Sequence, residues 1–273
     1  MIELPEVVTL ARQMDRELRG KRVSGLVRGN HEHKWVWYNR EREEFERLPI
    51  GKVVGEVRGE GKWISVALEP GLSLGFGDMG GRVQFHASEG TLPRNYHLLV
   101  RFDDGTLLTV AIQGWGFISL HDGGAAPPPG LGEVSPLGDD FTYTRFAAIV
   151  DAYENPAKNS VKALLVQRPK IMGIGNGYAQ DILFRARLDP RRKVATLGEP
   201  DARCLYSGLR DTLALAIERG GRDTERDLYG DPGGYVPLLD KRALGKPCPE
   251  CGTPIEKVSF LGGACYFCPQ CQA

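Results

Sequence analysis

Cys248-Pro249-Glu250-Cys251 and Cys268-Pro269-Gln270-Cys271 form two CxxC pairs near the end of the chain, with sixteen residues between them. Each pair sets two thiolates on one turn, and two pairs supply the four sulfur ligands of a tetrahedral zinc site. Gly262-Gly263 lies midway between the pairs, where a hairpin has to turn. With four protein ligands the metal would stabilise the fold and leave no open position for a substrate. The spacing predicts one structural Zn2+ in a zinc-finger hairpin.

The two other cysteines, Cys204 and Cys265, have no partner at ligand spacing, and we expect both to be small packed side chains. Paired cysteines of this kind are typical of metal binding inside the cell. The first six residues carry acids where a signal peptide needs a basic and then an apolar stretch, and no run of eighteen apolar residues exists. We therefore expect a cytoplasmic protein that does not enter a membrane.

Upstream of the cysteines the sequence has a helical pattern. Apolar periodicity predicts four helices, over 141–154, 160–167, 178–186 and 202–219. Gly220-Gly221 follows the last helix, as a glycine C-cap would. Gly173-Ile174-Gly175-Asn176-Gly177 connects the second and third helices, and such a turn presents backbone N–H groups and a helix N-terminus to a phosphate. The alternative is a plain helix connection without a ligand.

The chain has 35 basic and 35 acidic residues, so its net charge does not attract a polyanion. Between residues 158 and 193, however, nine basic residues stand against two acidic ones, Asp181 and Asp189, which leaves an excess of seven positive charges. Such a segment can hold several phosphates. An ordinary solvated helical face is the alternative interpretation.

A segment rich in proline and glycine divides the chain, because Pro127-Pro128-Pro129 supports neither a helix nor sheet pairing. Before it, Pro5 to Arg19 has the apolar spacing of one helical face. From Arg22 to His121, short apolar stretches alternate with glycine turns, which indicates an antiparallel β-sandwich or barrel. We expect a multidomain α+β protein. Its parts are an N-terminal domain 1–122, a linker 123–140, a helical domain 141–240 and the zinc hairpin 241–273.

Three motifs resemble those of the formamidopyrimidine-DNA glycosylase / endonuclease VIII family and occur in the family's order. They are Leu4-Pro5-Glu6-Val7-Val8-Thr9, Gly173-Ile174-Gly175-Asn176-Gly177-Tyr178-Ala179 and Cys248-Pro249-Glu250-Cys251-Gly252-Thr253-Pro254-Ile255. The resemblance covers essentially the whole chain. It implies an N-terminal helix on a two-layer β-sandwich, a helix-two-turn-helix domain and a zinc β-hairpin, with damaged or abasic double-stranded DNA as the partner. We expect a monomer associated with the nucleoid.

The chain departs from the family at its second residue. Members open with Met-Pro-Glu-Leu-Pro-Glu. After the methionine is removed, the proline amine attacks the deoxyribose C1′, expels the damaged base and promotes strand cleavage through a Schiff base. Ile2 replaces that proline, and a bulky second residue is expected to keep Met1 on the chain. Met1 offers a primary α-amine that can form an imine but lies one residue from the proper geometry. The resemblance and this departure together predict altered or weakened AP-lyase chemistry.

Three further positions match catalytic residues of the family. Glu3 matches the acid that assists sugar ring opening or activates water, and Glu6 matches a second carboxylate near the site. Lys62 matches a lysine that contacts phosphate near the lesion. With Met1 they form the expected catalytic set. Without the resemblance, the two glutamates would simply favour the positive end of the first helix, and Lys62 would be a surface lysine.

The resemblance also implies a DNA-binding set. Met79 matches an apolar wedge that fills the space of an extruded nucleotide, and Trp115 matches an aromatic residue that the family inserts into DNA. The other interpretation of both residues is a place in the core. The expected set is Met79, Arg94, Trp115, Lys158, Lys162 and Asn176, the last in the family's phosphate clamp. Gly114 and Gly263 stand where the family has DNA-contacting arginines, so two contacts are expected to be missing.

Two functions remain open. The favoured one is a base-excision-repair DNA N-glycosylase of altered chemistry, in which Glu3 or Glu6 activates water, or the amine of Met1 or Lys62 replaces the nucleophile. The second is a non-catalytic reader that recognises damaged or distorted DNA and bends it without turnover. A zinc-ribbon protein of transcription or RNA fits the full-length resemblance poorly. The sequence does not name the lesion, which depends on loops such as residues 222–235.

Overall fold

The structure is a computed structural model that describes residues 1–273 except 32, 124–133, 168–170 and 273. The chain divides into two compact units. The first consists of Met1–Pro129 and Arg219–Gly234, and the second of Gly130–Glu218 and Tyr235–Ala273. Residues 219–234, which the division by sequence places inside the helical domain, thus pack with the N-terminal unit.

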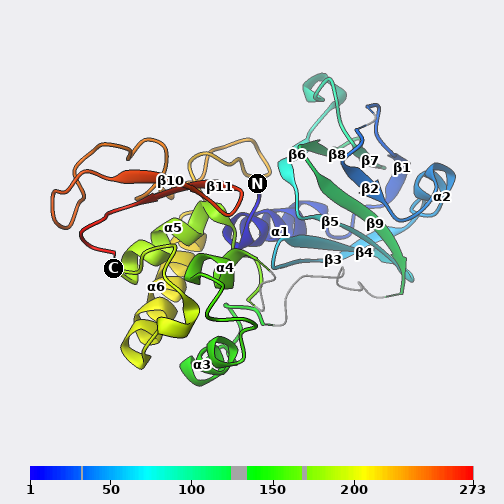
Figure 1. The fold of residues 1–273 in the computed structure, drawn as a ribbon. Helices are drawn as coiled ribbons and strands as arrows, with labels where there is room; N and C mark the ends of the chain where they lie inside the picture. The colour runs from blue at the N-terminus through cyan, green and yellow to red at the C-terminus, as the bar shows by residue number, and fades with distance from the viewer. Residues whose placement is uncertain (32, 124–133, 168–170, 273) are drawn as a thin grey trace. The chain divides into compact units, whose positions relative to one another are not determined.

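The first unit begins with helix α1 (Leu4–Leu18), one residue away at each end from the expected helix (Figure 1). Pro5 lies in its first turn, where a missing N–H costs nothing. The Glu6 carboxylate accepts a hydrogen bond from the Glu3 backbone N–H at 2.9 Å, as in a capping box. Leu10 and Met14 on the buried face of α1 belong to the hydrophobic core.

Two sheets form the β-sandwich of this unit (Figure 1). The four-stranded sheet has the order β1 (Val23–Val27), β7 (Leu98–Phe102), β8 (Leu107–Gln113), β6 (Gly80–His86). The five-stranded sheet has the order β2 (Val36–Tyr38), β9 (Gly116–Asp122), β5 (Leu72–Gly77), β4 (Trp63–Glu69), β3 (Val53–Glu60). Neighbouring strands are antiparallel except β2 and β9, which run parallel. The predicted sandwich is confirmed, and the parallel pair is an addition to it.

The core of the first unit draws on alternate residues of its strands, because successive side chains of a strand point to opposite faces. On β4, Ile64, Val66 and Leu68 are buried in the core, whereas the residues between them are only partly buried. Helix α2 (Arg42–Arg47) adds Phe45 to the same core. A short 3-10 turn, η1 (Glu89–Thr91), precedes β7.

The second unit is helical and ends in a β-hairpin. Its elements are α3 (Tyr143–Asp151), α4 (Val161–Val166), α5 (Asn176–Arg185), the 3-10 turn η2 (Val194–Thr196), α6 (Glu199–Glu218), β10 (Glu256–Phe260) and β11 (Gly263–Phe267). Thr142 and Ser160 cap α3 and α4, since each side chain accepts a hydrogen bond from a backbone N–H three residues on. The four predicted helices and the predicted hairpin are present, with ends that differ by a few residues.

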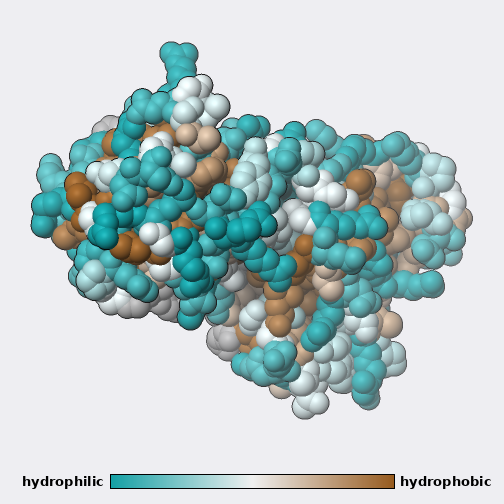
Figure 2. All heavy atoms as spheres, turned by 180° about the vertical axis from the view of Figure 1, so that it is seen from behind, coloured by the Kyte–Doolittle hydropathy of each residue, from teal (hydrophilic) through white to brown (hydrophobic). Residues whose placement is uncertain are grey.

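The surface is of the kind that folded proteins usually expose. Figure 2 shows hydrophilic residues over most of one face, with hydrophobic residues in separate patches. Single exposed apolar residues are normal, and only contiguous groups of them call for an explanation. Among the helices of the described residues, none is both long and apolar enough to cross a membrane.

Candidate functional site

The four predicted zinc ligands meet in the second unit. The Sγ atoms of Cys248 and Cys271 are 3.9 Å apart, those of Cys251 and Cys268 are 3.5 Å apart, and all four lie within 4.8 Å of one another. Four sulfurs about 2.3 Å from one zinc ion would be about 3.8 Å from each other. The geometry fits a tetrahedral metal, and the chain has a structural zinc centre as predicted.

The hairpin of the zinc centre is fastened to two helices of the second unit. The Nζ atom of Lys162 on α4 donates a hydrogen bond to the carbonyl oxygen of Phe260 at 2.8 Å. On α5, the Gln180 side-chain oxygen accepts a hydrogen bond from the Tyr266 N–H at 2.6 Å, and the Asn176 Nδ2 donates to the Ala264 carbonyl at 3.1 Å. Polar side chains of both helices thus hold the two hairpin strands.

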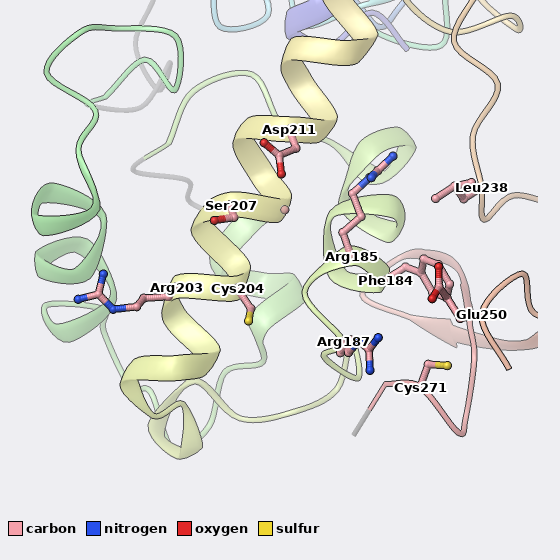
Figure 3. A pocket seen from close by; sticks show the side chains of 11 residues that line it. Phe184, Arg185, Arg187, Arg203, Cys204, Ser207, Asp211, Leu238, Glu250 and Cys271 are labelled. Atoms are coloured by element: carbon pink, nitrogen blue, oxygen red, sulfur yellow. The ribbon is translucent and has the colours of Figure 1, made fainter.

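A cavity of about 470 Å³ lies between α5, α6 and the zinc-binding segment (Figure 3). Arg203 turns away from it toward α3, whereas Arg185 and Arg187 lie on the α5 side (Figure 3). Asp211 and Glu250 also line the wall, so charges of both signs face the same space. None of the predicted catalytic residues lines this cavity, and we assign it no role in catalysis.

The predicted catalytic glutamates belong to a buried charge cluster at the start of α1. Its centre is Arg222, which is 7% exposed. The Arg222 guanidinium lies 3.5 Å from Glu3 Oε1 and 3.3 Å from Glu6 Oε1, and its backbone N–H donates to Glu6 Oε1 at 3.0 Å. A third carboxylate, that of Glu225, is 3.5 Å from Arg222 Nη2. Burying a carboxylate is costly unless it is paired, so the ion pairs with Arg222 offset the cost of burying Glu3 and Glu6.

The chain terminus joins this cluster at its solvent edge. The Met1 ammonium nitrogen lies 3.0 Å from Glu225 Oε1, and the Met1 carbonyl accepts a hydrogen bond from Arg222 Nη2 at 2.6 Å. Met1 is 37% exposed. The only terminal amine of the chain is therefore held in the same cluster as the two candidate carboxylates, and Glu225 engages it as an ammonium group.

Ile2 occupies the position of the missing proline as a core residue. Its side chain is buried with the hydrophobic core, and its N–H donates a hydrogen bond to the Met79 carbonyl at 3.0 Å. A peptide nitrogen has its lone pair delocalised into the carbonyl and cannot attack a sugar carbon. Position 2 thus has a packing role in this chain.

Lys62 lies beside this region through main-chain hydrogen bonds. It is half-buried in the turn between β3 and β4, and its carbonyl oxygen accepts a hydrogen bond from the Asp78 N–H at 2.9 Å. Asp78 has a positive φ of 42° and directly precedes Met79. Backbone hydrogen bonds therefore connect the Asp78-Met79 segment to Lys62 on one side and to Ile2 on the other.

Two residues of the predicted DNA-binding set, Met79 and Lys162, are buried in this structure. Met79 is fully buried in the hydrophobic core of the first unit, so it is not an exposed wedge, and the alternative interpretation as a core residue holds. Lys162 is 1% exposed, because its stem packs inside the second unit and its ammonium group is used by the Phe260 carbonyl. In this arrangement the Lys162 ammonium is directed at the hairpin.

The four remaining members of the DNA-binding set are exposed: Arg94, Trp115, Lys158 and Asn176. Asn176 begins α5 after Gly175, the arrangement expected of an anion-binding helix start, although its amide also donates to the hairpin. Contact of these four residues with DNA stays a prediction.

Part of the positive charge between residues 158 and 193 is neutralised inside the second unit. Arg191 pairs with Asp189, and Arg192 with Asp201, each at 2.5 Å.

The sequence reasoning missed Arg222 and Glu225 as members of the site. Their segment follows α6, and Gly220 and Gly221 turn it back with φ of 73° and 91°. A side chain at Gly221 would lie 3.0 Å from the Glu6 side chain, so glycine permits the close approach. From the sequence, Gly220-Gly221 indicates a helix cap. In the structure the pair also returns the chain to α1, and this second role is what brings Arg222 and Glu225 to Glu6.

Comparison with known families agrees with this architecture. Residues 1–112 match the formamidopyrimidine-DNA glycosylase N-terminal domain, and residues 133–227 match the formamidopyrimidine-DNA glycosylase H2TH domain. Residues 245–273 match the zinc finger found in FPG and IleRS. The three matches follow the order in which the sandwich, the helices and the zinc hairpin occur in this chain.

Individual relatives match along the whole chain. The formamidopyrimidine-DNA glycosylases of Symbiobacterium thermophilum and Salinispora arenicola are each 32% identical to it, over 100% of this chain and 89% and 96% of their own length. The MutM (Fpg) structure of Thermus thermophilus has 29% identity and a TM-score of 0.80, with 99% and 98% of the two chains covered. Lactococcus lactis Fpg bound to DNA with an abasic site has the same fold, with a TM-score of 0.82, 21% identity and 99% of each chain covered. This chain belongs to the formamidopyrimidine-DNA glycosylase family.

Proposed function

We propose that this protein binds damaged double-stranded DNA as a monomer and removes a base from it as a DNA N-glycosylase with weakened AP-lyase chemistry. The family membership supports the substrate class, since the Lactococcus lactis relative was solved with abasic-site DNA. A protein that repairs DNA would associate with the nucleoid, and this location is part of the proposal. The observation that carries the proposal is the cluster in which Glu3, Glu6 and the Met1 amine are all linked through Arg222 and Glu225.

The cluster retains two reactive groups of the family but restrains each of them. A carboxylate that activates water must be free to accept its proton, and Glu3 and Glu6 both pair with Arg222. An amine that forms an imine must be unprotonated, and the Met1 amine is paired with Glu225. Water activation needs only that Arg222 shift on DNA binding. Imine formation also needs the Met1 amine to reach the position of the family's proline amine, one residue further along the chain. We therefore expect base release to exceed strand cleavage.

The test separates the two reactions. Wild-type protein in excess is incubated with a duplex that carries an oxidised base, and base loss is measured by heat and alkali. Imine formation is measured by borohydride trapping with the same duplex and with an abasic-site duplex. Base loss with little trapping supports the proposal. Trapping as strong as base loss contradicts the weakened lyase, and peptide mapping of the adduct to Met1 or Lys62 then identifies the amine.

One observation favours a second candidate, a reader of damaged DNA without turnover. Arg222 is buried together with Glu3 and Glu6 and forms an ion pair with each of them. If this arrangement persists on DNA, no group is left to activate water. Tight binding to lesion duplexes, combined with no base loss over many hours in excess protein, would show that the protein recognises damaged DNA without turnover.

A further inference from the structure

Four large aromatic side chains are exposed near one another in the first unit. Trp35, Trp37, Trp115 and Phe117 are 49%, 42%, 45% and 40% exposed. We call this group the aromatic edge, because β2 is the outer strand of the five-stranded sheet and β9 is its neighbour. Folded proteins rarely leave contiguous apolar area uncovered unless it binds something.

The strand register explains why these rings share one face. In the parallel pair, Val36 lies opposite Gly116 and Trp37 opposite Phe117. Val36 and Ile118 point into the core, so Trp37 and Phe117 point outward. Trp35 precedes Trp37 by two residues, and its ring lies beside that of Trp37. Trp115 precedes Phe117 by two residues, and the backbone brings it near Trp35, since the Gly116 N–H donates to the Trp35 carbonyl at 3.0 Å.

The rings form a surface with defined spacing. Trp37 and Phe117 are stacked, with centroids 5.0 Å apart and planes 22° apart, and the centroids of Trp35 and Trp37 are 6.2 Å apart. The next residue across the sheet from Phe117 is Gly77. A side chain there would collide with the Lys62 carbonyl and with the Trp63 ring, 2.9 Å away. The position beside Phe117 is therefore occupied by the side chain of Trp63, which pairs with Gly77 on the next strand.

Positive charge accompanies the aromatic edge. The Lys34 ammonium lies over the Trp35 ring, 5.0 Å from its centroid. Asn30 fixes the neighbouring loop, since its side chain donates to the Arg94 carbonyl at 2.9 Å and accepts from the Tyr96 N–H at 3.0 Å. Arg94 is exposed on that loop. The Lys34 ammonium thus adds a positive charge to the exposed rings, a combination that binds the bases and phosphates of single strands.

We propose that the aromatic edge binds unpaired nucleobases of single-stranded DNA by stacking. Bases in a duplex have both faces covered by their neighbours, so the rings can stack only on bases outside a helix. A protein partner is less well matched, because an apolar surface laid over Trp35 would bury the Lys34 ammonium without a counter-charge. The inference rests on the proposed function in taking DNA as the ligand. It adds a single-stranded ligand at Trp35, Trp37 and Phe117, whereas Trp115 and Arg94 also belong to the set expected to contact the duplex.

The experiment uses full-length zinc-loaded protein and four probes. They are an abasic-site duplex, the same duplex with a ten-thymidine single-stranded tail, the same duplex with a tail of ten base-free tetrahydrofuran units, and a free fifteen-thymidine strand. The base-free tail has the charge of the thymidine tail but nothing to stack. Three of the four tryptophans belong to the aromatic edge, so quenching of tryptophan fluorescence reports stacking directly.

The variants are Trp37→Ala, Phe117→Ala and the conservative Trp37→Phe, with Ile50→Ala as a matched control because Ile50 is another exposed apolar residue of the same unit. We expect the thymidine tail to tighten wild-type binding about tenfold or more over the base-free tail. The two alanine variants should lose that gain and the quenching, whereas Trp37→Phe and Ile50→Ala keep the gain.

Binding to the blunt abasic duplex is measured in the same series. Unchanged blunt-duplex binding in the alanine variants with loss of the tail effect supports the inference, whether or not base release occurs. Equal affinity for both tails in wild type overturns it and leaves the proposed function untouched. A change from dimer to monomer in Trp37→Ala, with tail binding unaltered, overturns it in favour of a contact between copies.

Discussion

Ile2 has two tasks at the residue scale, since its side chain fills the core and its presence keeps Met1 in the charge cluster. A small residue or proline at this position would permit removal of Met1 and would release Glu225 and Arg222 from their contacts with it. The new terminal amine would then lie next to Glu3 in the chain. Changing this one position therefore tests both the missing nucleophile and the restraint on the cluster.

Ile2→Pro should increase borohydride trapping and strand cleavage on abasic duplexes about tenfold or more over wild type, because a terminal secondary amine stands at the family's position. Ile2→Ala is the control, since it also allows loss of Met1 but supplies a primary amine. Intact mass verifies the processing. Efficient trapping by wild type would show that our interpretation of position 2 is wrong. Failure of a folded, DNA-binding Ile2→Pro would point instead to the missing arginines at Gly114 and Gly263.

His97 makes the first unit sensitive to acid. Burial, with His33 and His31 nearby, lowers the pKa of His97 to about 4. Its Nδ1 accepts a hydrogen bond from the Ile112 N–H at 2.9 Å, which protonation of that nitrogen would remove. In the unfolded chain the pKa is about 6.5, so the unfolded state binds more protons between pH 6.5 and 4. Stability is full above this window and falls as pH drops through it.

We expect acidification from pH 7 to 4.5 to lower the unfolding free energy of the first unit by roughly 2 kcal/mol through His97. Urea unfolding followed by tryptophan fluorescence measures it. His97→Asn, whose side-chain oxygen can still accept from Ile112, should make the pH dependence shallower and leave a remainder from His86, whose pKa burial also lowers. An unaltered slope in His97→Asn would contradict this account.

At the scale of elements, the two lysines at α4 show that a basic residue in a positively charged segment need not be on the surface. Lys158 before the helix is exposed, whereas Lys162 in its first turn is buried against the hairpin. The local excess of positive residues contains both, and sequence spacing does not separate them. The hairpin partner of Lys162, Phe260, lies 98 residues further along the chain.

Lys162→Met should lower the stability of the second unit by about 1–3 kcal/mol, because the Phe260 carbonyl loses its charged donor, and should leave the salt dependence of duplex binding unchanged. Lys158→Ala should leave the stability of the second unit unchanged. If Lys158 contacts a phosphate, this variant should make the slope of log affinity against log salt shallower by about 1. Circular dichroism melts and salt titrations measure the two effects. A shallower salt slope in folded Lys162→Met would show instead that Lys162 contacts a phosphate of the bound DNA.

Elements with local signals could be predicted, and those that depend on distant partners could not. The periodicity of α1, the glycine turn before α5 and the CxxC pairs are each contained in a few residues. The pairing of β2 with β9 joins residues 36–38 to residues 116–118, and no local pattern encodes that choice. Met79 was misplaced for a similar reason, since apolar side chains look alike whether they end in the core or on the surface. Arg222 was missed because its partners are at the other end of the chain.

For the whole molecule, the zinc centre belongs to a small core of its own around Cys248, Cys268, Phe184 and Leu239 in the second unit. All four tryptophans are in the first unit, at positions 35, 37, 63 and 115. Loss of the metal and unfolding of the sandwich can therefore be followed by separate signals.

Elemental analysis should find about one zinc per chain, and a value well below one in chelator-free preparations would contradict the zinc assignment. Cys268→Ser should lose the metal, unfold the hairpin and weaken duplex binding, because structural zinc contributes directly to folding. The midpoint of tryptophan-monitored unfolding should remain that of wild type. Cys204→Ser is the control, since Cys204 lies outside the cluster of ligands and is exposed, so the expectation of a packed side chain is wrong for Cys204 and holds for the buried Cys265.

Because residues 219–234 belong to the first unit, that unit can be completed only after most of the chain has been synthesised. Glu6 leaves the ribosome 216 residues before Arg222, the residue that pairs with it inside the protein. Until then a nascent chain that closed its N-terminal unit would have to bury Glu3 and Glu6 without their counter-ion. We therefore expect the start of α1 to stay open until Arg222 has been synthesised. The helical unit is largely synthesised in the meantime, and a ribosome stalled before residue 222 would display an N-terminal unit that cannot reach its final state.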